Sequence, residues 1–506
     1  MKLPRCIAAR LARQHGPIHG LTTPYSQLAA ASLCARRRLP QKITVAYSSW
    51  WSGRKYATAV SATELQFGQP VHETHPHILK AGEITPGITA QEYHDRRAKL
   101  ALSLPDGAVA VLAAAELKYR SGPVFFPFRQ ESNFLYLTGF SEPEAMVVIQ
   151  KTGPRHGDYT FHLLCRPKDP QAEQWSGPWS GLQAAQDVFN ADVAGDISNV
   201  ESILPPLVKG ATWIYTDIEM NKAGHPTDFA NLVRRANSTV GVQRLQPLVN
   251  RLRAIKSSAE IANMRKAGQI SGRVISDAMR RDWKTEKELE TFLNYQFTVS
   301  GCDGPAYVPV VAGGPRGCGI HYVQNNAMLD RDDMVLVDAG GEYGAYITDI
   351  SRTWPLSGRF SPAQRDLYLA VLKVQRSVVS LCRESSGMTL DRLHRITEDG
   401  LRDQLTQLGF DMSGNALQIL FPHHVGHYVG LDVHDVPGYG RHHPLKSGHC
   451  VTVEPGVYVP KDERWPKHFR GMAVRIEDSV CVDDDSPFIL TTEAVKEVED
   501  IEALRD

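Results

Sequence analysis

The stretch that decides the fold is VLVDAGGEYGAYITDISRTWP, residues 335–355. Two short apolar runs flank Tyr343 and Gly344, which predicts a β-hairpin with its turn centred on those two residues. That register places Asp338 directly opposite Asp349. Facing carboxylates repel each other, and burial among apolar residues raises the cost because a buried carboxylate needs a partner. The hairpin therefore predicts a neutralising partner between the two aspartates.

Two later segments repeat this anomaly. HCVTVEPGVYV (449–459) places Glu454 in a strand-like apolar run, and GMAVRIEDSVCV (471–482) does the same with Glu477, beside Arg475. Taken singly, each acid fits an edge strand that faces water. Four acids in three Val/Ile-rich strand segments make that interpretation much weaker. A cation is the simplest partner that neutralises them.

Histidines gather in the same half of the chain. The segment PHHVGHYVGLDVHD (422–435) holds four of them, and CGIHYVQNN adds His321; the four are His423, His424, His427 and His434. Hard oxygen ligands with an imidazole favour Mn²⁺, Mg²⁺ or Fe²⁺ over a structural Zn²⁺. Four carboxylates exceed what one divalent ion needs, so the sequence predicts two ions that share bridging carboxylates.

The composition excludes some classes of protein. At 506 residues, with 42% hydrophobic and 22% charged residues, the chain predicts more than one domain. No apolar run reaches the length of a membrane span. Residues 1–56 contain ten Lys/Arg and no Asp or Glu, which leaves 46 Lys/Arg against 56 Asp/Glu in the remainder. An acidic body disfavours nucleic acid as a partner.

The basic segment 1–56 predicts a mitochondrial presequence, with a disordered basic tail that binds RNA or membrane as the alternative. RKYAT (54–58) resembles the end of many fungal presequences. Cleavage after Lys55 would expose Tyr56, and loss of Tyr56 would leave Ala57, so we hypothesise that this protein is itself processed in this way. The eight cysteines lack C-x-x-C spacing, which fits reduced thiols in a matrix or cytosolic compartment.

The rest of the chain predicts α/β architecture in two domains. A helix is expected from Thr89, and alternating apolar segments follow: AVAVLAAA, NFLYLTGF, AMVVIQ, YTFHLLCR and TWIYTDIE. Ser257 or Ser258 is expected to cap a long helix with Glu260 in its first turn. We place the N-terminal domain at residues 57–247 and the second domain at residues 248–506.

These motifs resemble those of the pita-bread metallopeptidases. Asp, eleven residues to a second Asp, H-x-x-x-H-x-x-G-x-x-x-H, E-P-G and R-I-E-D follow each other in the order found in methionine aminopeptidase, prolidase and aminopeptidase P, whose fold the non-metal creatinase shares. FRQESNFLYLTGF (128–140) and WSGPWSG (175–181) resemble the N-terminal domain of aminopeptidase P. The chain is most similar to the fungal mitochondrial intermediate-cleaving aminopeptidases. The resemblance implies a smaller α/β N-terminal domain followed by a pita-bread catalytic domain.

The resemblance also implies roles for individual residues. The metal ligands would be Asp338, Asp349, His427, Glu454 and Glu477. His321 and His434 would contact the substrate carbonyl and the tetrahedral intermediate, and His423 would line the substrate pocket. Glu454 would also shuttle a proton, and Arg475 would orient carboxylates. His424 has no role in the family and is expected to be structural.

The implied function is that of a dinuclear, Mn²⁺-dependent aminopeptidase. It would remove one bulky N-terminal residue from imported proteins after presequence cleavage, in the mitochondrial matrix, with inner-membrane attachment left open. The N-terminal domain or a partner subunit would close part of the cleft, and family habit suggests a homodimer. One alternative is a general Xaa-Pro aminopeptidase. Another is an inactive peptide-binding module, which predicts a broken ligand set, whereas every ligand is present here.

Overall fold

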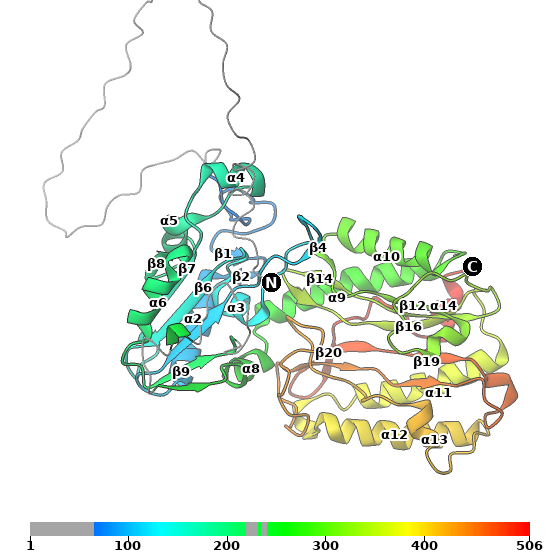
Figure 1. The fold of residues 1–506 in the computed structure, drawn as a ribbon. Coiled ribbons are helices and arrows are strands. Elements are labelled where there is room, and N and C mark those ends of the chain that lie inside the picture. The colour runs from blue at the N-terminus through cyan, green and yellow to red at the C-terminus, as the bar shows by residue number, and fades with distance from the viewer. Residues whose placement is uncertain (1–64, 219–230, 234–239) are drawn as a thin grey trace, which may run out of the picture.

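The computed structural model describes residues 65–218, 231–233 and 240–506. The predicted presequence, residues 1–56, lies outside the described residues. Two α/β parts are arranged side by side (Figure 1). The predicted two-domain architecture is therefore confirmed. The exact domain limits stay a prediction, and helix α8 (Gln246–Ala254) runs across the one at residue 247. Within the described residues, no helix combines the length and apolar character needed to cross a membrane.

The N-terminal part is built on one six-stranded mixed sheet in the order β10-β9-β3-β6-β7-β8. Its strands are β3 (Val109–Ala113), β6 (Met146–Lys151), β7 (Tyr159–Cys165), β8 (Val193–Asp196), β9 (Trp213–Thr216) and β10 (Gly241–Gln243). β3 and β6 are almost fully buried because helices cover both faces of the sheet. The helices are α2 (Ala90–Ser103), α3 (Ser132–Thr138), α4 (Pro170–Ser176), α5 (Gly181–Asp187) and α6 (Val200–Val208). Two small ribbons complete this part: β1 (Glu83–Thr85) with β2 (Ile88–Thr89), and β4 (Tyr119–Ser121) with β5 (Val124–Phe125).

The expected start of α2 and the cap of the long helix are both confirmed. The Thr89 side chain accepts a hydrogen bond from the Glu92 amide at the start of α2. Ser257 caps α9 (Ser258–Met279) in a capping box with Glu260. One apolar segment, NFLYLTGF, differs from its neighbours: it forms helix α3 instead of a strand, because Glu131 caps its first turn and Gly139 ends it in the left-handed region.

The C-terminal part has strands between two layers of helices (Figure 1). One layer is formed by α9 and α10 (Glu286–Val299), and the other by α11 (Pro362–Val379) and α12 (Leu390–Gln407). The shorter helices are α13 (Ala416–Leu420) and α14 (Val498–Ala503). The strands of the first half are β11 (Gly304–Pro305), β12 (Val310–Gly313), β13 (Met334–Asp338), β14 (Gly341–Tyr343), β15 (Tyr346–Ile347) and β16 (Ser351–Pro355). Those of the second half are β17 (Cys450–Val453), β18 (Gly456–Tyr458), β19 (Ala473–Arg475), β20 (Asp478–Val482) and β21 (Pro487–Ile489).

The predicted register of the central hairpin is wrong, because the turn lies one residue further along the chain than predicted. Strands β14 and β15 pair Tyr343 with Tyr346, so the turn lies at Gly344 and Ala345. Both turn residues have positive φ, 57° and 67°, as a type I′ hairpin requires. A turn centred on Tyr343 and Gly344 would force the bulky Tyr343 into that region.

The corrected register changes which residues face each other. Asp338 is paired with Ser351, two residues beyond Asp349. Because side chains alternate along a strand, Asp349 lies on the same face as Ser351 and is a diagonal neighbour of Asp338. The two aspartates therefore converge without lying directly opposite each other.

One hydrophobic core is shared by the two parts of the molecule. Tyr93 and Phe134, from the N-terminal part, are buried in the same cluster as Tyr346, Leu431 and Leu490 from the C-terminal part. Leu245, just before α8, and Val249, within α8, belong to this cluster too. The two domains are therefore packed against each other through buried apolar side chains.

Candidate active site

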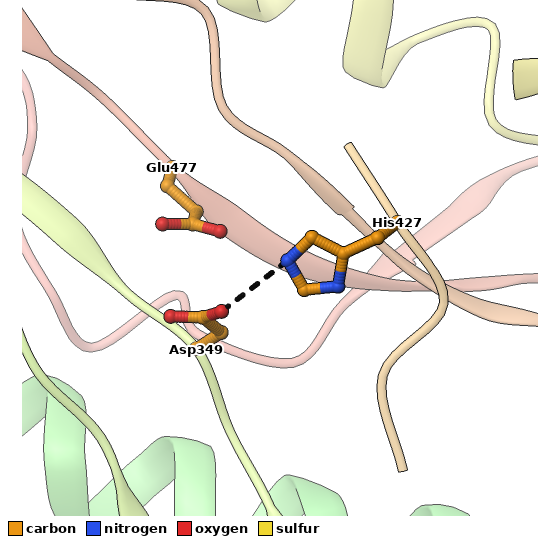
Figure 2. A group of neighbouring side chains, drawn as sticks. All are labelled: Asp349, His427 and Glu477. Atoms are coloured by element: carbon orange, nitrogen blue, oxygen red, sulfur yellow. Dashed lines mark ion pairs between the residues drawn. The ribbon is translucent and has the colours of Figure 1, made fainter. Parts of the chain in front are cut away.

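The acidic residues predicted from sequence meet where several strands end. Asp338 ends β13, and Asp349 lies just before β16. Strands β17 and β20 pair Val453 with Asp478, so Glu454 and Glu477 are the next pair of that register. Figure 2 shows Asp349 and Glu477 pointing toward the ring of His427. One potential ligand atom from each of these three residues lies within 4.8 Å of the other two.

Short contacts link the remaining ligand candidates. His427 Nε2 lies 3.5 Å from Asp349 Oδ2 and 3.6 Å from Glu454 Oε1. The Tyr307 hydroxyl lies 2.8 Å from Asp338 Oδ1 and 2.5 Å from Asp349 Oδ1, as a donor that both carboxylates share. The structure therefore brings all five predicted ligands into one cluster, in which Asp349 and Glu477 are buried and the other three are half-buried.

The charges of this cluster are not balanced by protein groups alone. Burial and the neighbouring Asp349 raise the pKa of Asp338 to about 6. Burial raises the pKa of Glu454 to about 7, although His427 acts in the opposite direction. The pKa of Glu477 lies well above its ordinary value, again because of burial and then of Asp349. These three shifts have the sign expected of carboxylates that lack a cation. Asp349 differs, because burial alone would raise its pKa but its contacts, chiefly with His427, lower it.

An unpaired oxygen marks where a cation fits. Glu477 is 1% exposed, and its Oε1 has no hydrogen-bond partner, although Oε2 accepts a hydrogen bond from the Ser351 hydroxyl at 2.7 Å. Buried polar atoms without a partner are rare, and a bound ion is one of the groups that satisfy them. Four carboxylates and one imidazole are the donors that hard divalent ions prefer. The residues present therefore fit divalent metal ions.

Arg475 and Ser351 hold the carboxylates in place. Arg475 donates from Nη2 to Asp338 Oδ2 at 2.7 Å and from Nε to Ser351 Oγ at 2.7 Å. Its Nη1 donates to the Tyr458 hydroxyl at 3.0 Å. Ser351 in turn donates to Glu477. One buried arginine therefore fixes two of the acids, the second through a serine.

Hydroxyl groups of β17 and β20 hold the backbones of two predicted ligands, His427 and Asp349. Thr452 Oγ1 accepts a hydrogen bond from the His427 amide at 3.1 Å. Ser479 Oγ accepts from the Asp349 amide at 3.1 Å and donates to the Asp349 carbonyl at 2.9 Å. Gly426 allows this close approach, because a Cβ atom there would lie 2.0 Å from the Thr452 carbonyl oxygen.

Of the two further predicted histidines, His434 contacts the cluster directly. The ring centroid of His434 is 4.3 Å from that of His427, edge to face. Burial, His427 and, to a smaller extent, His321 lower the pKa of His434. His321 and His434 are both exposed. The imidazole of His434 therefore packs against His427 and is also accessible to solvent.

His423 and His424 make different contacts from each other. His423 Nε2 is 2.8 Å from the Tyr458 hydroxyl, and its Nδ1 is 3.8 Å from Glu454 Oε2. His424 stacks on His394, with ring centroids 4.5 Å apart, and its Nδ1 lies 2.8 Å from the Gly426 carbonyl. His423 therefore borders the acidic cluster, whereas the contacts of His424 lie away from it.

Five polar residues of this site were not predicted from the sequence: Tyr307, Ser351, Thr452, Tyr458 and Ser479. Ser351 and Thr452 each lie two positions from a predicted ligand, and strand alternation places such residues on the ligand's face. That signal was available in the sequence. Tyr307 reaches the cluster from a separate segment, so nothing local indicated it.

Comparisons with known proteins agree with this geometry. The model of metallopeptidase family M24 matches residues 262–484, and that of the aminopeptidase P N-terminal domain matches residues 93–215. Intermediate cleaving peptidase 55 of Saccharomyces cerevisiae is 42% identical over 451 residues, which are 87% of this chain and 88% of that protein. Its mitochondrial counterpart in Arabidopsis thaliana is 34% identical over 87% of this chain and 88% of its own length.

Another relative has a different name, and a crystal structure shares the fold. Xaa-Pro aminopeptidase 3 of Mus musculus is 38% identical over 86% of this chain and 90% of its own length. The crystal structure of Saccharomyces cerevisiae Icp55 without its N-terminal 58 residues superposes with a TM-score of 0.79 at 40% identity, and the alignment covers 84% of this chain and 99% of that one.

Proposed function

Since this chain belongs to metallopeptidase family M24 and is a metalloaminopeptidase, we propose that it removes a single N-terminal residue from proteins imported into mitochondria. The residue removed would be Tyr, Leu or Phe, exposed by an earlier presequence cleavage. The observation that carries the proposal is the 42% identity to intermediate cleaving peptidase 55, which runs through both domains. The acid-free basic segment at residues 1–56 supports the mitochondrial address.

Family membership implies divalent metal ions, and we propose two Mn²⁺ ions as the cofactor. The five candidate ligands are Asp338, Asp349, His427, Glu454 and Glu477. Bound there, the ions would supply Lewis acidity, which polarises the carbonyl of the first peptide bond and makes water acidic. The unpaired Oε1 of Glu477 supports this assignment.

The chain's own residues would orient the substrate and move the proton. Glu454 would carry a proton from the attacking water to the leaving nitrogen. The ring N–H groups of His321 and His434 would donate to the carbonyl oxygen as it gains negative charge. His423 would border the substrate pocket from its place beside Glu454. Arg475 would keep Asp338 oriented throughout.

The N-terminal domain would limit removal to one residue. Arg129, in that domain, donates from Nε to the Glu342 carboxylate at 3.1 Å and from Nη2 to the Leu431 carbonyl. Leu431 lies between His427 and His434, so this contact reaches the segment that carries both histidines. We propose that this contact closes the cleft on the side from which the N-terminus of the substrate enters.

A second candidate is a general Xaa-Pro aminopeptidase. The 38% identity to mouse Xaa-Pro aminopeptidase 3 favours it, because that alignment also covers both domains. The two candidates share the same ligands and differ in whether proline must follow the scissile bond. A homodimer in the matrix is compatible with either.

The deciding experiment uses the purified full chain supplied with Mn²⁺ and two peptides, one beginning Tyr-Ala-Thr and one beginning Tyr-Pro-Thr. Mass spectrometry follows the loss of the first residue. Loss of Tyr from the Tyr-Ala peptide, at a rate similar to or above that of the Tyr-Pro peptide, is the expected result. Cleavage of the Tyr-Pro peptide alone would replace our proposal with the second candidate. Asp338→Asn serves as the inactive control.

A further inference from the structure

The segment that carries His434 is anchored by acids on both of its sides. Asp432 and Asp435 lie two residues before and one residue after His434. The Asp435 amide donates to the Tyr428 carbonyl at 2.8 Å, and the Asp432 amide donates to Asp435 Oδ1 at 3.3 Å. His434 thus sits on a short loop that is closed by its own neighbours.

This loop is held by side chains from one face of α8 and from Lys256, which lies two residues after the helix ends. Asn250 Nδ2 donates to the Pro437 carbonyl at 2.7 Å. Arg253 Nη2 donates to Asp432 Oδ2 at 2.6 Å and also to Asp435 Oδ1. Lys256 Nζ donates to Asp435 Oδ2 at 2.8 Å. Three side chains, spaced by three residues, therefore reach the same loop from outside the catalytic strands.

The ion contacts at Asp435 lie out of reach of solvent. The side chains of Asp435 and Lys256 are each 1% exposed, and that of Arg253 is 3% exposed. Charges at such depth are stable only when they are paired in good geometry, and removal of one partner is costly. We name Arg253, Lys256 and Asp435 the Asp435 clamp.

The backbone after the loop needs such support. Val436 has φ of 46°, a left-handed conformation that is costly for a β-branched side chain. It is also 1% exposed and belongs to the core of the C-terminal part. A strained residue persists only where its surroundings fix it, and the Asp435 clamp ends immediately before it.

The clamp continues into the N-terminal domain. Arg253 Nη1 donates to Asn133 Oδ1 at 2.7 Å, and the Ser132 hydroxyl donates to Asp432 Oδ1 at 2.7 Å. Ser132 and Asn133 form the first turn of α3. The loop with His434 is therefore tied to α8 and α3 at the same time.

We propose that the Asp435 clamp is a positioning device for His434, which fixes the loop so that the imidazole stays against His427. This inference rests on the proposed function, in which His434 stabilises charge on the substrate carbonyl oxygen. Neither Arg253 nor Lys256 would touch the substrate. Both act through the loop that Asp435 closes.

The first test is kinetic and uses the full chain with the Tyr-Ala peptide. Asp435→Asn keeps the size of the side chain but removes its charge, and should lower kcat by about tenfold to a hundredfold with little change in KM. In a His434→Ala background the same substitution should change kcat less than about twofold, because residues that act as a unit are not additive. Lys256→Met leaves the Arg253 contact intact. It should lower kcat by a smaller factor than Asp435→Asn, again with little change in KM.

A matched control separates positioning from loss of stability. Glu142 is another buried carboxylate with an arginine partner, since its Oε2 lies 3.5 Å from Arg166 Nη2, and it belongs to the N-terminal domain. Glu142→Gln should lower thermal stability and leave kcat within about twofold of the unmutated protein. An equal fall of kcat in this control would assign the effect to general destabilisation.

The second test does not depend on turnover. Hydrogen exchange of the amides in residues 428–436 should become at least about tenfold faster in Asp435→Asn and stay unchanged in Glu142→Gln. Unchanged exchange, a loss confined to KM, or full additivity with His434→Ala would each overturn the positioning role. If the unmutated protein cleaves neither peptide, the proposed function fails, whereas the exchange experiment still decides whether the clamp fixes the loop.

Discussion

Ser351 is uncharged and fully buried, yet two charged groups of the site depend on its hydroxyl. The hydroxyl accepts a hydrogen bond from Arg475 and donates one to Glu477. Ser351 therefore links the position of Glu477 to that of Arg475. Its place opposite Asp338 in the β13–β16 ladder puts it on the same face as Asp349. A single oxygen thus orders acids from two different strand pairs.

We predict that Ser351→Ala weakens Mn²⁺ binding by about tenfold to a hundredfold, the usual effect of removing a group that orients a metal ligand. Titration calorimetry of the purified variant measures this. Ser276→Ala is the control, because Ser276 Oγ also makes two hydrogen bonds, to the Glu493 carbonyl and from the Val495 amide, without contact to the cluster. Unchanged affinity in Ser351→Ala would show that Arg475 and the ions alone orient Glu477.

At the residue scale, the charged residues of the cluster could be singled out from the sequence, whereas the neutral residues that hydrogen-bond to them could not. Asp338, Asp349, Glu454 and Glu477 stood out because acids are anomalous in apolar strands, and the structure gathers them. Their roles as ligands stay a proposal. Tyr307 did not stand out, since a tyrosine before a buried strand is ordinary and its contact to Asp349 depends on tertiary packing.

At the scale of elements, the hairpin between β14 and β15 shows what fixes a register. Gly344 and Ala345 both adopt positive φ, and the strands on each side follow from that turn. The sequence predicted the hairpin but not its register, because Tyr343-Gly344 and Gly344-Ala345 each offer only one glycine. The cost of a tyrosine in the left-handed region decides between them. The prediction of the NFLYLTGF segment failed for a similar reason, since its helix depends on the cap at Glu131.

We predict that Ala345→Gly stabilises the protein by about 0.5 kcal/mol, since relief of the left-handed strain outweighs the added chain entropy. Urea denaturation measures the change. Ala172→Gly in helix α4, where the backbone is helical, should instead destabilise by roughly 0.5–1 kcal/mol. Equal destabilisation in both variants would mean that the turn at Ala345 carries no strain.

At the scale of the whole molecule, stability should depend on pH through the Asp435 clamp. Burial alone would raise the pKa of Asp435, but Lys256 and Arg253 lower it to about 2. A carboxyl group whose pKa is lower in the folded state contributes stability above its unfolded pKa and loses it as pH falls. That contribution is therefore complete at neutral pH and disappears between about pH 4 and pH 2.

We predict that the difference in unfolding free energy between the unmutated protein and Asp435→Asn, roughly 2–3 kcal/mol at pH 6, shrinks steadily as pH falls from about 4 toward 2. Urea denaturation at pH 6, 4 and 3 measures it. The corresponding difference for Ser276→Ala should not vary with pH, because no titrating side chain is removed. A difference for Asp435→Asn that is also independent of pH would contradict the shifted pKa.

The core shared by both domains has a consequence for folding while the chain is synthesised or imported. Tyr93 and Phe134 are buried against Leu431 and Leu490, which follow them by more than 290 residues. The N-terminus appears first, whether the chain leaves a ribosome or crosses a membrane. The core of the first domain therefore cannot be completed until nearly the last residues have appeared. During that wait its apolar side chains are open to other proteins, and a chaperone that shields them until Leu490 arrives would decide how much enzyme is formed.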